Sequence, residues 1–250
     1  MTKKNNSVTA IIQARMGSSR LPGKVMMDIA GRPMLWHVID RVHRSTKIDN
    51  IVIATTALTE DDRIREFAEK LTLPCYRGQV DDVLGRYCGA AVESKAGTIV
   101  RICSDQPLID PEIIDKIIAA YTDSGADYAS NTLKETYPLG VYAEVFSYNT
   151  LKKAKDEATK DYEREHVTPY IYRHPEIFRL KSVEAEGGLR RPDLRLTVDT
   201  EEDLKLVREI YHNLYRGDKV FSLGKVIELL DKHPEIAAVN AHIKQKRLGE

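Results

Sequence analysis

A glycine-containing loop with three cationic side chains follows the first apolar run of the chain. The stretch IIQARMGSSRLPGKV carries Arg15, Arg20 and Lys24, with Gly17 and Gly23 between them. One interpretation is a solvated turn whose charges are incidental. The other is a cradle for a polyphosphate, because a cation about 4 Å from a phosphate oxygen contributes about 4 kcal/mol at an effective dielectric constant near 20. A cradle requires the loop to lie where a ligand can bind.

Two aspartates follow apolar segments elsewhere in the chain. Asp105 comes after IVRICS and Asp199 comes after LRLTV. Transfer of a nucleotide needs magnesium to bridge phosphate oxygens and to neutralise the departing pyrophosphate, and magnesium in proteins takes one or two carboxylates and keeps several waters. The other interpretation is a capping acid at a strand-to-helix turn, which suits Asp199 because Thr200 opens a helix.

The loop differs from the two common glycine-rich nucleotide motifs. Gly17 and Gly23 are separated by five residues instead of the four of a Walker loop, and Val25 stands where a Ser or Thr would bind magnesium. The dinucleotide pattern G-x-G-x-x-G is absent from the sequence. The loop therefore offers backbone donors near Gly17 and Ser18 together with three fixed charges.

The composition argues against several classes of protein. Lys and Arg number 38, as do Asp and Glu, so no global field attracts nucleic acid or a membrane. The three cysteines, Cys75, Cys88 and Cys103, form no close pair, which argues against a disulfide framework or a zinc site. The stretch MTKKNNSVTA lacks the apolar region of a signal peptide, and no apolar run approaches about 18 residues. We expect a cytoplasmic protein with neither nucleic acid nor a membrane as a partner.

The elements that would position these residues alternate through the first half of the chain. The pattern predicts strands at 8–14, 50–56, 74–78 and 97–105 and helices at 32–45, 59–71, 80–94 and 110–125. Continuous apolar strands that alternate with helices indicate a parallel sheet covered on both faces. Ligands bind at the carboxyl ends of the strands in such sheets, so the loop after the first strand lies in a suitable place.

The second half of the chain predicts a mixed sheet. Strands are expected at 126–131, 141–147, 177–185 and 194–200, with helices at 149–158, 162–174 and 201–214. The last forty residues are expected to be amphipathic helix ending in a solvated basic tail, HIKQKRLGE. We expect one domain over residues 1–250, in which residues 137–192 could form a protruding arm for dimerisation or substrate binding.

The segment AIIQARMGSSRLPGKVMMDIAGRPMLWHVIDRV resembles the N-terminal signature of cytidylyltransferases that activate acidic sugars as CMP conjugates. This family includes the CMP-Kdo and CMP-nonulosonic acid synthetases, and the sequence is most similar to its SpsF-like branch, which serves spore coat polysaccharide biosynthesis. Six further segments lie in the expected order: IVIATT, YRGQVDDVLGRY, PLIDPEIID, EVFSYNTL, EREHVTPYIY and LRLTVDTEEDL. The resemblance implies a three-layer α/β fold of the nucleotide-diphospho-sugar transferase (Rossmann-like) type, with a mostly parallel, mixed sheet.

The resemblance also implies roles for residues of the first half. The catalytic residues would be Arg15, Arg20, Lys24 and Asp105, and Asp105 and Asp199 would bind Mg²⁺. The nucleotide-binding residues would be Gln13, Ala14, Arg15, Gly17, Ser18, Arg20, Lys24, Thr55, Arg77 and Asp105. A surface salt bridge is the alternative for Arg77. Ser104 stands where the family usually has Gly, which reduces local backbone freedom.

The acceptor pocket is expected from the second half of the chain. By resemblance, its residues would be Tyr137, Gly140, Glu144, Arg164, Glu165 and His166. A carboxylated sugar needs cationic or amide donors, and Arg164 and His166 are suitable. A packed, hydrogen-bonded core histidine is the alternative for His166. Many SpsF-like chains carry an Asp soon after the glycine that corresponds to Gly140, where this chain has Tyr142 and Ala143.

The activity expected from the resemblance is direct in-line attack by a sugar hydroxyl on the α-phosphorus of CTP, with Mg²⁺ as cofactor and pyrophosphate as the leaving group. A homodimer is expected by resemblance alone. A glycosyltransferase that uses a nucleotide-sugar donor is one alternative, although CSDQP does not supply its usual D-x-D metal motif. A catalytically silent nucleotide-binding subunit is the other.

Overall fold

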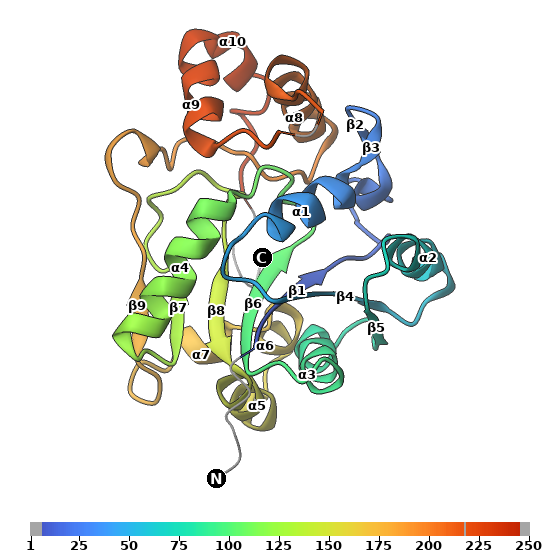
Figure 1. Cartoon of the computed structure of the whole chain (residues 1–250), viewed down its shortest axis with the longest axis vertical. Coiled ribbons are helices and arrows are strands. Elements are labelled where there is room, and N and C mark those ends of the chain that lie inside the picture. Colours follow the sequence, from blue (N-terminus) through green and yellow to red (C-terminus); the bar gives the residue numbers. More distant parts are fainter. Residues whose placement is uncertain (1–6, 218, 246–250) are drawn as a thin grey trace.

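The computed structural model describes residues 7–217 and 219–245, and its centre is a seven-stranded mixed sheet (Figure 1). The strand order is β5-β4-β1-β6-β8-β7-β9. The strands are β1 Val8–Gln13, β4 Asn50–Thr56, β5 Cys75–Gly78, β6 Thr98–Cys103, β7 Tyr128–Ser130, β8 Glu144–Ser147 and β9 Leu180–Ser182. Neighbours are parallel except where β8 pairs with β6 and with β7. The predicted fold class, a mostly parallel mixed sheet, is confirmed.

Helices cover both faces of the sheet. The helices are α1 Met34–His43, α2 Asp62–Lys70, α3 Val83–Glu93, α4 Pro111–Ser124, α5 Tyr148–Glu157, α6 Asp161–His166, α7 Pro169–Tyr172, α8 Glu201–Leu214, α9 Leu223–Lys232 and α10 Pro234–Ala237. Helices α1, α2, α4, α8 and α9 belong to one buried cluster, and α3, α5 and α7 belong to the other. The short strands β2 Asp28–Ile29 and β3 Arg32–Pro33 form a separate hairpin.

The alternation of side chains along β1 explains why its apolar run is continuous. Ala10 and Ile12 lie in the cluster that contains α1 and α4, whereas Ile11 lies in the cluster that contains α3 and α5. Successive residues of a strand point to opposite faces, so a strand covered on both sides needs apolar residues throughout. This packing fixes the direction in which the chain leaves β1.

Polar side chains at two helix starts fix the elements beside the carboxyl ends of the strands. Asp110 caps α4 by accepting the backbone N–H of Glu112 at 2.9 Å, as its position before Pro111 predicts. Its second oxygen accepts the N–H of Leu223 at 2.6 Å and so joins α4 to α9. Thr200 begins α8 in a capping box with Asp203.

The predicted strand at 194–200 is wrong. The segment makes one isolated bridge, between Leu139 and Arg195, and belongs to no strand of the sheet. Its backbone donors go to different partners: Leu196 N–H donates to the carbonyl of Leu139 at 2.7 Å, and Val198 N–H donates to that of Asp105 at 2.9 Å. Its alternating apolar side chains are buried, but no neighbouring strand runs alongside to continue a ladder.

Two other predictions need correction. The helix predicted at 162–174 is broken at Val167, whose φ of +72° ends α6 before α7 begins. The last forty residues are not one helical run, since a non-helical segment separates α8 from α9 and α10, and the tail at 246–250 lies outside the described residues.

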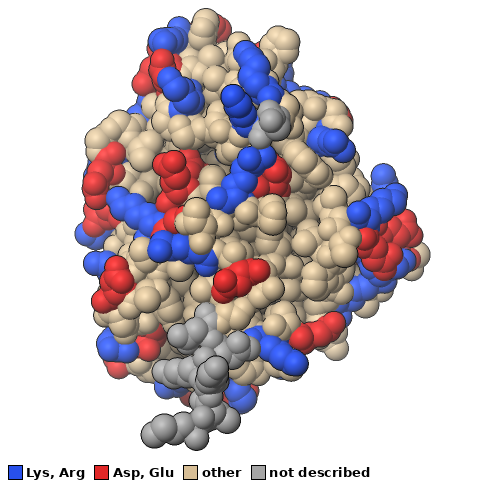
Figure 2. Space-filling model, in the orientation of Figure 1, with Lys and Arg blue, Asp and Glu red and all other residues tan. Residues whose placement is uncertain are grey.

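Residues 137–192, considered as an arm, contribute strands β8 and β9 to the sheet and helices α5 and α7 to one face. Their role in dimerisation stays a prediction. On the face seen in Figure 2, basic and acidic side chains are interspersed, in keeping with the balanced composition. Among the described residues, no helix has the length and apolar character needed to span a bilayer.

We predict that Gly140→Ala destabilises the fold. Gly140 has a φ of +100°, and an added Cβ would lie 2.3 Å from the backbone nitrogen of Thr197 and 2.6 Å from the carbonyl carbon of Leu196. The free energy of unfolding, measured by urea denaturation, should fall by at least about 2 kcal/mol. Gly188→Ala is the control, because nothing lies within 4 Å of its added Cβ. Equal stability of the two variants would contradict the prediction.

Candidate active site

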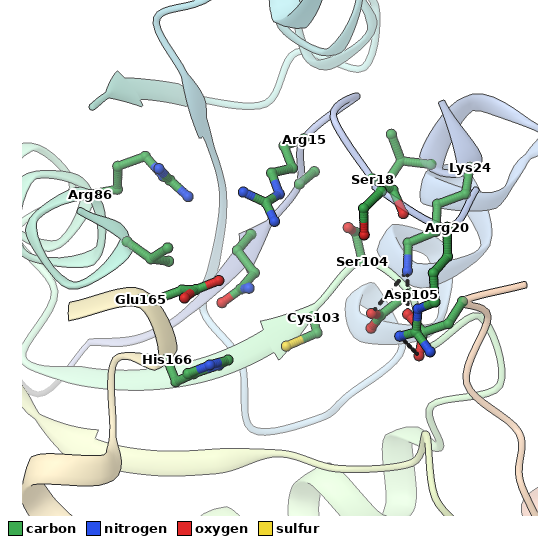
Figure 3. A pocket seen from close by; sticks show the side chains of 16 residues that line it. Arg15, Ser18, Arg20, Lys24, Arg86, Cys103, Ser104, Asp105, Glu165 and His166 are labelled. Atoms are coloured by element: carbon green, nitrogen blue, oxygen red, sulfur yellow. Dashed lines mark hydrogen bonds and ion pairs between the residues drawn. The ribbon is translucent and has the colours of Figure 1, made fainter. Parts of the chain in front are cut away.

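A cavity of about 280 Å³ lies at the carboxyl ends of β1 and β6 (Figure 3). Its walls come from the end of β1, the cationic loop, the end of β6, the start of α3, the end of α6 and the segment before α8. Ten of the predicted site residues line it: Gln13, Ala14, Arg15, Ser18, Arg20, Lys24, Asp105, Glu165, His166 and Asp199. The topology therefore brings residues from both halves of the chain to one place.

The cationic loop is closed at its base by a single carbonyl. The oxygen of Met16 accepts the backbone N–H groups of Ser18 at 2.9 Å and Gly23 at 2.8 Å. Gly23 has a φ of +72°, which favours glycine, and a short 3-10 helix begins at Lys24 directly after it. The Met16 N–H donates to Asp61 at 2.6 Å. This closure turns Lys24 back toward the sheet.

Lys24 joins the two aspartates that the sequence singles out. Its ammonium lies 3.2 Å from Asp105 Oδ2 and 2.8 Å from Asp199 Oδ1, and it donates to the carbonyl of Val198 at 2.6 Å. Burial lowers the pKa of Lys24, but the charges of Asp105 and Asp199 outweigh this effect and raise the pKa above its ordinary value. The ammonium is therefore a fixed positive charge between two carboxylates.

Asp199 is held by three cations. Besides Lys24, Arg20 Nη2 lies 3.0 Å and Arg195 Nη2 lies 2.9 Å from Asp199 Oδ2. Burial raises the pKa of this carboxyl, but the nearby charges, Lys24 first among them, lower it below its ordinary value. These contacts thus favour the ionised form of Asp199 and fix its orientation.

Arg195 and Asp203 support Asp199 from behind. Arg195 Nε lies 2.8 Å from Asp203 Oδ1, and Asp203 Oδ2 also accepts the backbone N–H of Asp199 at 2.9 Å. The Asp203 side chain is fully buried. Neither residue is among those predicted from the sequence for the site. The T-x-x-D pattern from Thr200 to Asp203 signals a helix start, but the ion pair with Arg195 is a tertiary contact.

A second cavity, of about 650 Å³, meets the first at the aspartates. The two share five lining residues: Arg20, Cys103, Asp105, His166 and Asp199. The predicted acceptor residues Gly140 and Glu144 line the second cavity. A group bound beside Asp105 and Asp199 would thus face a ligand in either cavity.

Glu144 is fully occupied by partners in the protein. Its carboxylate forms an ion pair with Arg101 and accepts hydrogen bonds from Tyr128 OH at 2.5 Å and Thr168 Oγ1 at 2.6 Å. His166 lines both cavities, and burial together with the charges of Arg101 and Arg15 lowers its pKa. Of these two predicted acceptor residues, His166 is the one whose side chain is available to a ligand.

Five predicted site residues line neither cavity: Gly17, Thr55, Arg77, Tyr137 and Arg164. Arg77 forms a salt bridge with Asp62 at 2.6 Å, which was its alternative interpretation. Arg164 Nη2 pairs with Asp82 at 2.8 Å. Lining residues that sequence analysis did not assign include Ser19, Arg86 and Cys103. Cys103 could have been predicted as a lining residue, because it is the last residue of β6 and so lies at the edge of the sheet where ligands bind.

Asp105 and Asp199 are the carboxylates that could bind a magnesium ion, and in this structure the Lys24 ammonium lies between them. Among residues 7–217 and 219–245, no group of three or more His, Cys, Asp or Glu side chains could hold a metal by itself. Asp105 and Asp199 nevertheless converge on one ammonium group, so their oxygens already share a small volume. Magnesium requires only one or two carboxylates when phosphate and water complete its shell.

The chain is similar to known proteins over most of its length. The profile of the cytidylyltransferase family matches residues 9–227. The chain is 38% identical to an uncharacterized protein of Methanocaldococcus jannaschii, over 97% of this chain and 98% of that protein. It is 36% identical to the spore coat polysaccharide biosynthesis protein SpsF of Bacillus subtilis, over 93% of this chain and 97% of that protein.

Two solved structures resemble the fold. A cytidylyltransferase from Leptospira borgpetersenii superposes with a TM-score of 0.87 at 30% identity, over 96% of this chain and 99% of that one. A CMP:2-keto-3-deoxy-manno-octonic acid synthetase complexed with CTP superposes with a TM-score of 0.65 at 17% identity, over 82% of this chain and 98% of that one. Because its identity is only 17%, the second structure supports a conclusion about the fold alone.

Proposed function

Because the chain belongs to the cytidylyltransferase family, we propose that it transfers CMP from CTP to an acidic sugar of the nonulosonic or Kdo-like type and releases pyrophosphate. The observation that carries the proposal is the position of Lys24 between Asp105 and Asp199, where the two cavities meet. The first cavity would hold CTP and the second the acceptor. The product would serve the biosynthesis of a surface polysaccharide, as the name of the Bacillus relative suggests.

The phosphate chain would lie along the cationic loop. Arg15, Ser18, Arg20 and Lys24 line the first cavity at its loop side (Figure 3). Fixed cations in a partly enclosed site stabilise the charge that develops on the departing pyrophosphate, because they need no reorganisation at the moment of reaction. Asp105 and Asp199 would hold a magnesium ion, which supplies charge neutralisation and alignment of phosphate oxygens when it is bound.

The sugar hydroxyl would attack from the second cavity. Attack on the α-phosphorus forms the new P–O bond while the bond to the β-phosphate oxygen breaks, and the hydroxyl proton leaves to a base. The shared wall of Arg20, Asp105 and Asp199 is the place where both substrates would meet. Family membership favours this reaction over transfer from a nucleotide-sugar donor. Mg²⁺ dependence, a homodimer and a cytoplasmic location stay predictions.

The reaction can be tested by a pyrophosphate-release screen that crosses the four common nucleoside triphosphates with a set of acidic sugars. We expect release with CTP and at least one acidic sugar. Product formation only from a nucleotide-sugar donor and an acceptor would overturn the proposal in favour of a glycosyltransferase. No turnover with any combination would favour a silent nucleotide-binding subunit.

We predict that Lys24→Ala lowers kcat about 100-fold or more, because a preorganised donor is lost from the developing charge. Steady-state kinetics with CTP and the acceptor from the screen provide the measurement. Lys70→Ala, at an exposed position at the end of α2, is the matched control. Turnover of Lys24→Ala equal to that of the control would remove Lys24 from the mechanism.

We predict that Asp105→Asn abolishes stimulation by magnesium while the protein stays folded. The amide keeps the size of the side chain but loses the charge that a hard cation needs. Magnesium titration of the CTP complex by calorimetry and thermal unfolding together separate metal binding from stability. Asp123→Asn, exposed on α4, is the control. An unchanged magnesium response in Asp105→Asn would show that another group binds the metal.

A further inference from the structure

Two glutamine side chains line the second cavity but not the first. They are Gln106, which follows Asp105 and is 6% exposed, and Gln245, which comes from the far end of the chain and is exposed at this cavity. A carboxamide can donate through its nitrogen and accept through its oxygen, so its chemical role depends on which end is already occupied.

The orientation of Gln106 is set by the backbone. Its Oε1 accepts the N–H of Tyr142 at 2.7 Å. A backbone N–H can only donate, so the oxygen must occupy this side of the amide. The Nε2 group lies on the opposite branch and carries two donors that no described partner receives.

The orientation of Gln245 is set by a charge. Its Oε1 accepts from Arg195 Nη1 at 2.6 Å, and a guanidinium has donors only. Arg195 cannot easily rotate away, because Asp203 and Asp199 bind its remaining nitrogens at 2.8 to 3.0 Å. No residue in the described part of the chain accepts from the Nε2 group of Gln245, so this group also remains as a donor there.

Buried hydrogen bonds hold the chain just before Gln245. Asn240 is 2% exposed, and its Nδ2 group donates to the carbonyl of Arg195 at 3.0 Å and to Asp203 Oδ1 at 2.8 Å. The same arginine and aspartate that support Asp199 thus anchor the C-terminal segment. This shared support links the acceptor cavity to the aspartate pair.

Four carboxylates line this cavity: Asp105 and Asp199 are paired with Lys24, Glu135 is exposed, and the fourth is Glu144. Glu144, the most buried carboxylate of that cavity, already accepts from Arg101, Tyr128 and Thr168. An oxyanion that receives two N–H donors forms charge-assisted hydrogen bonds, which are stronger than those to a neutral hydroxyl. A carboxylate is the group of an acidic sugar that meets this condition.

We propose that Gln106 and Gln245 form the subsite for the carboxylate of the acceptor, and that Gln245 gives the enzyme its preference for anionic over neutral acceptors. The inference rests on the proposed function in that it takes the second cavity as the acceptor site. It adds a role in acceptor recognition for Gln245, which lies about 140 positions after Asp105 in the sequence.

The first experiment measures steady-state kinetics of Gln245→Ala and Gln245→Glu with the best acidic sugar from the screen and with its methyl ester. Gln245→Ala should raise the KM for the acid about tenfold, with kcat and the KM for CTP nearly unchanged, because a hydrogen bond to a charged group is lost. Gln245→Glu should raise the KM for the acid further by repulsion but leave the ester unaffected. Lys244→Ala, exposed and outside both cavities, is the matched control.

A second experiment measures binding without turnover. Calorimetry with 3-deoxy-manno-octulosonate and other sugar acids, in the presence of a non-hydrolysable CTP analogue, should show weaker binding to Gln245→Glu than to the wild type. Binding with this pattern but no turnover would support the subsite and overturn the proposed function. Three outcomes would overturn the subsite. The first is turnover with equal KM values in the wild type and Gln245→Glu, and the second is an equal effect of the substitution on the KM for the acid and for the ester. The third is the absence of sugar-acid binding to the wild type.

Discussion

The site depends on one buried ammonium group placed between two carboxylates. Asp105 and Asp199 come from distant parts of the chain, and without Lys24 their like charges would repel each other in a partly enclosed space. The Coulomb attraction in each contact is about 4 kcal/mol at an effective dielectric constant near 20, less where water screens the more exposed Asp105, and the cost of burying the charges offsets part of it. The same three charges that tie the loop to the sheet are the ones that would meet a metal and a phosphate. Stability of the loop and chemistry of the site thus rest on a single arrangement.

Much of the fold follows from the apolar pattern, and so does the part of the site that strand ends create. β1, β4 and β6 are buried on both faces, so their runs are continuous and their boundaries clear. The loop after β1 and the aspartate after β6 lie at the same edge for that reason. The segment before Asp199 shows the limit of the pattern. The alternation of apolar and polar residues in this segment reflects the burial of its side chains. The pattern of a single segment does not indicate whether another strand lies beside it to form hydrogen bonds.

The parts of the site that could not be predicted depend on contacts between distant residues. Arg195 pairs with Asp203, which is near in the sequence, but it also donates a hydrogen bond to Gln245, fifty positions later. Arg77 is a predicted ligand-binding residue that instead has a partner in the protein. Its position at a strand end would suit a ligand, but its side chain forms an ion pair with Asp62 on the neighbouring helix. Residue type and strand position could not separate these outcomes, because both depend on which partner lies nearer in space.

The antiparallel direction of β8 determines which cavity the chain before it lines. Because β8 runs against β6, the connection from β7 to β8 crosses the catalytic edge and supplies six residues to the second cavity and none to the first: Thr132, Leu133, Glu135, Leu139, Gly140 and Tyr142. Gly140 and Tyr137 of this connection are buried, whereas Glu135 is exposed, and exposed loop positions tolerate replacement better than strands do. On the proposed assignment, a substitution at an exposed position such as Glu135 would alter the acceptor cavity and leave the lining of the CTP cavity unchanged.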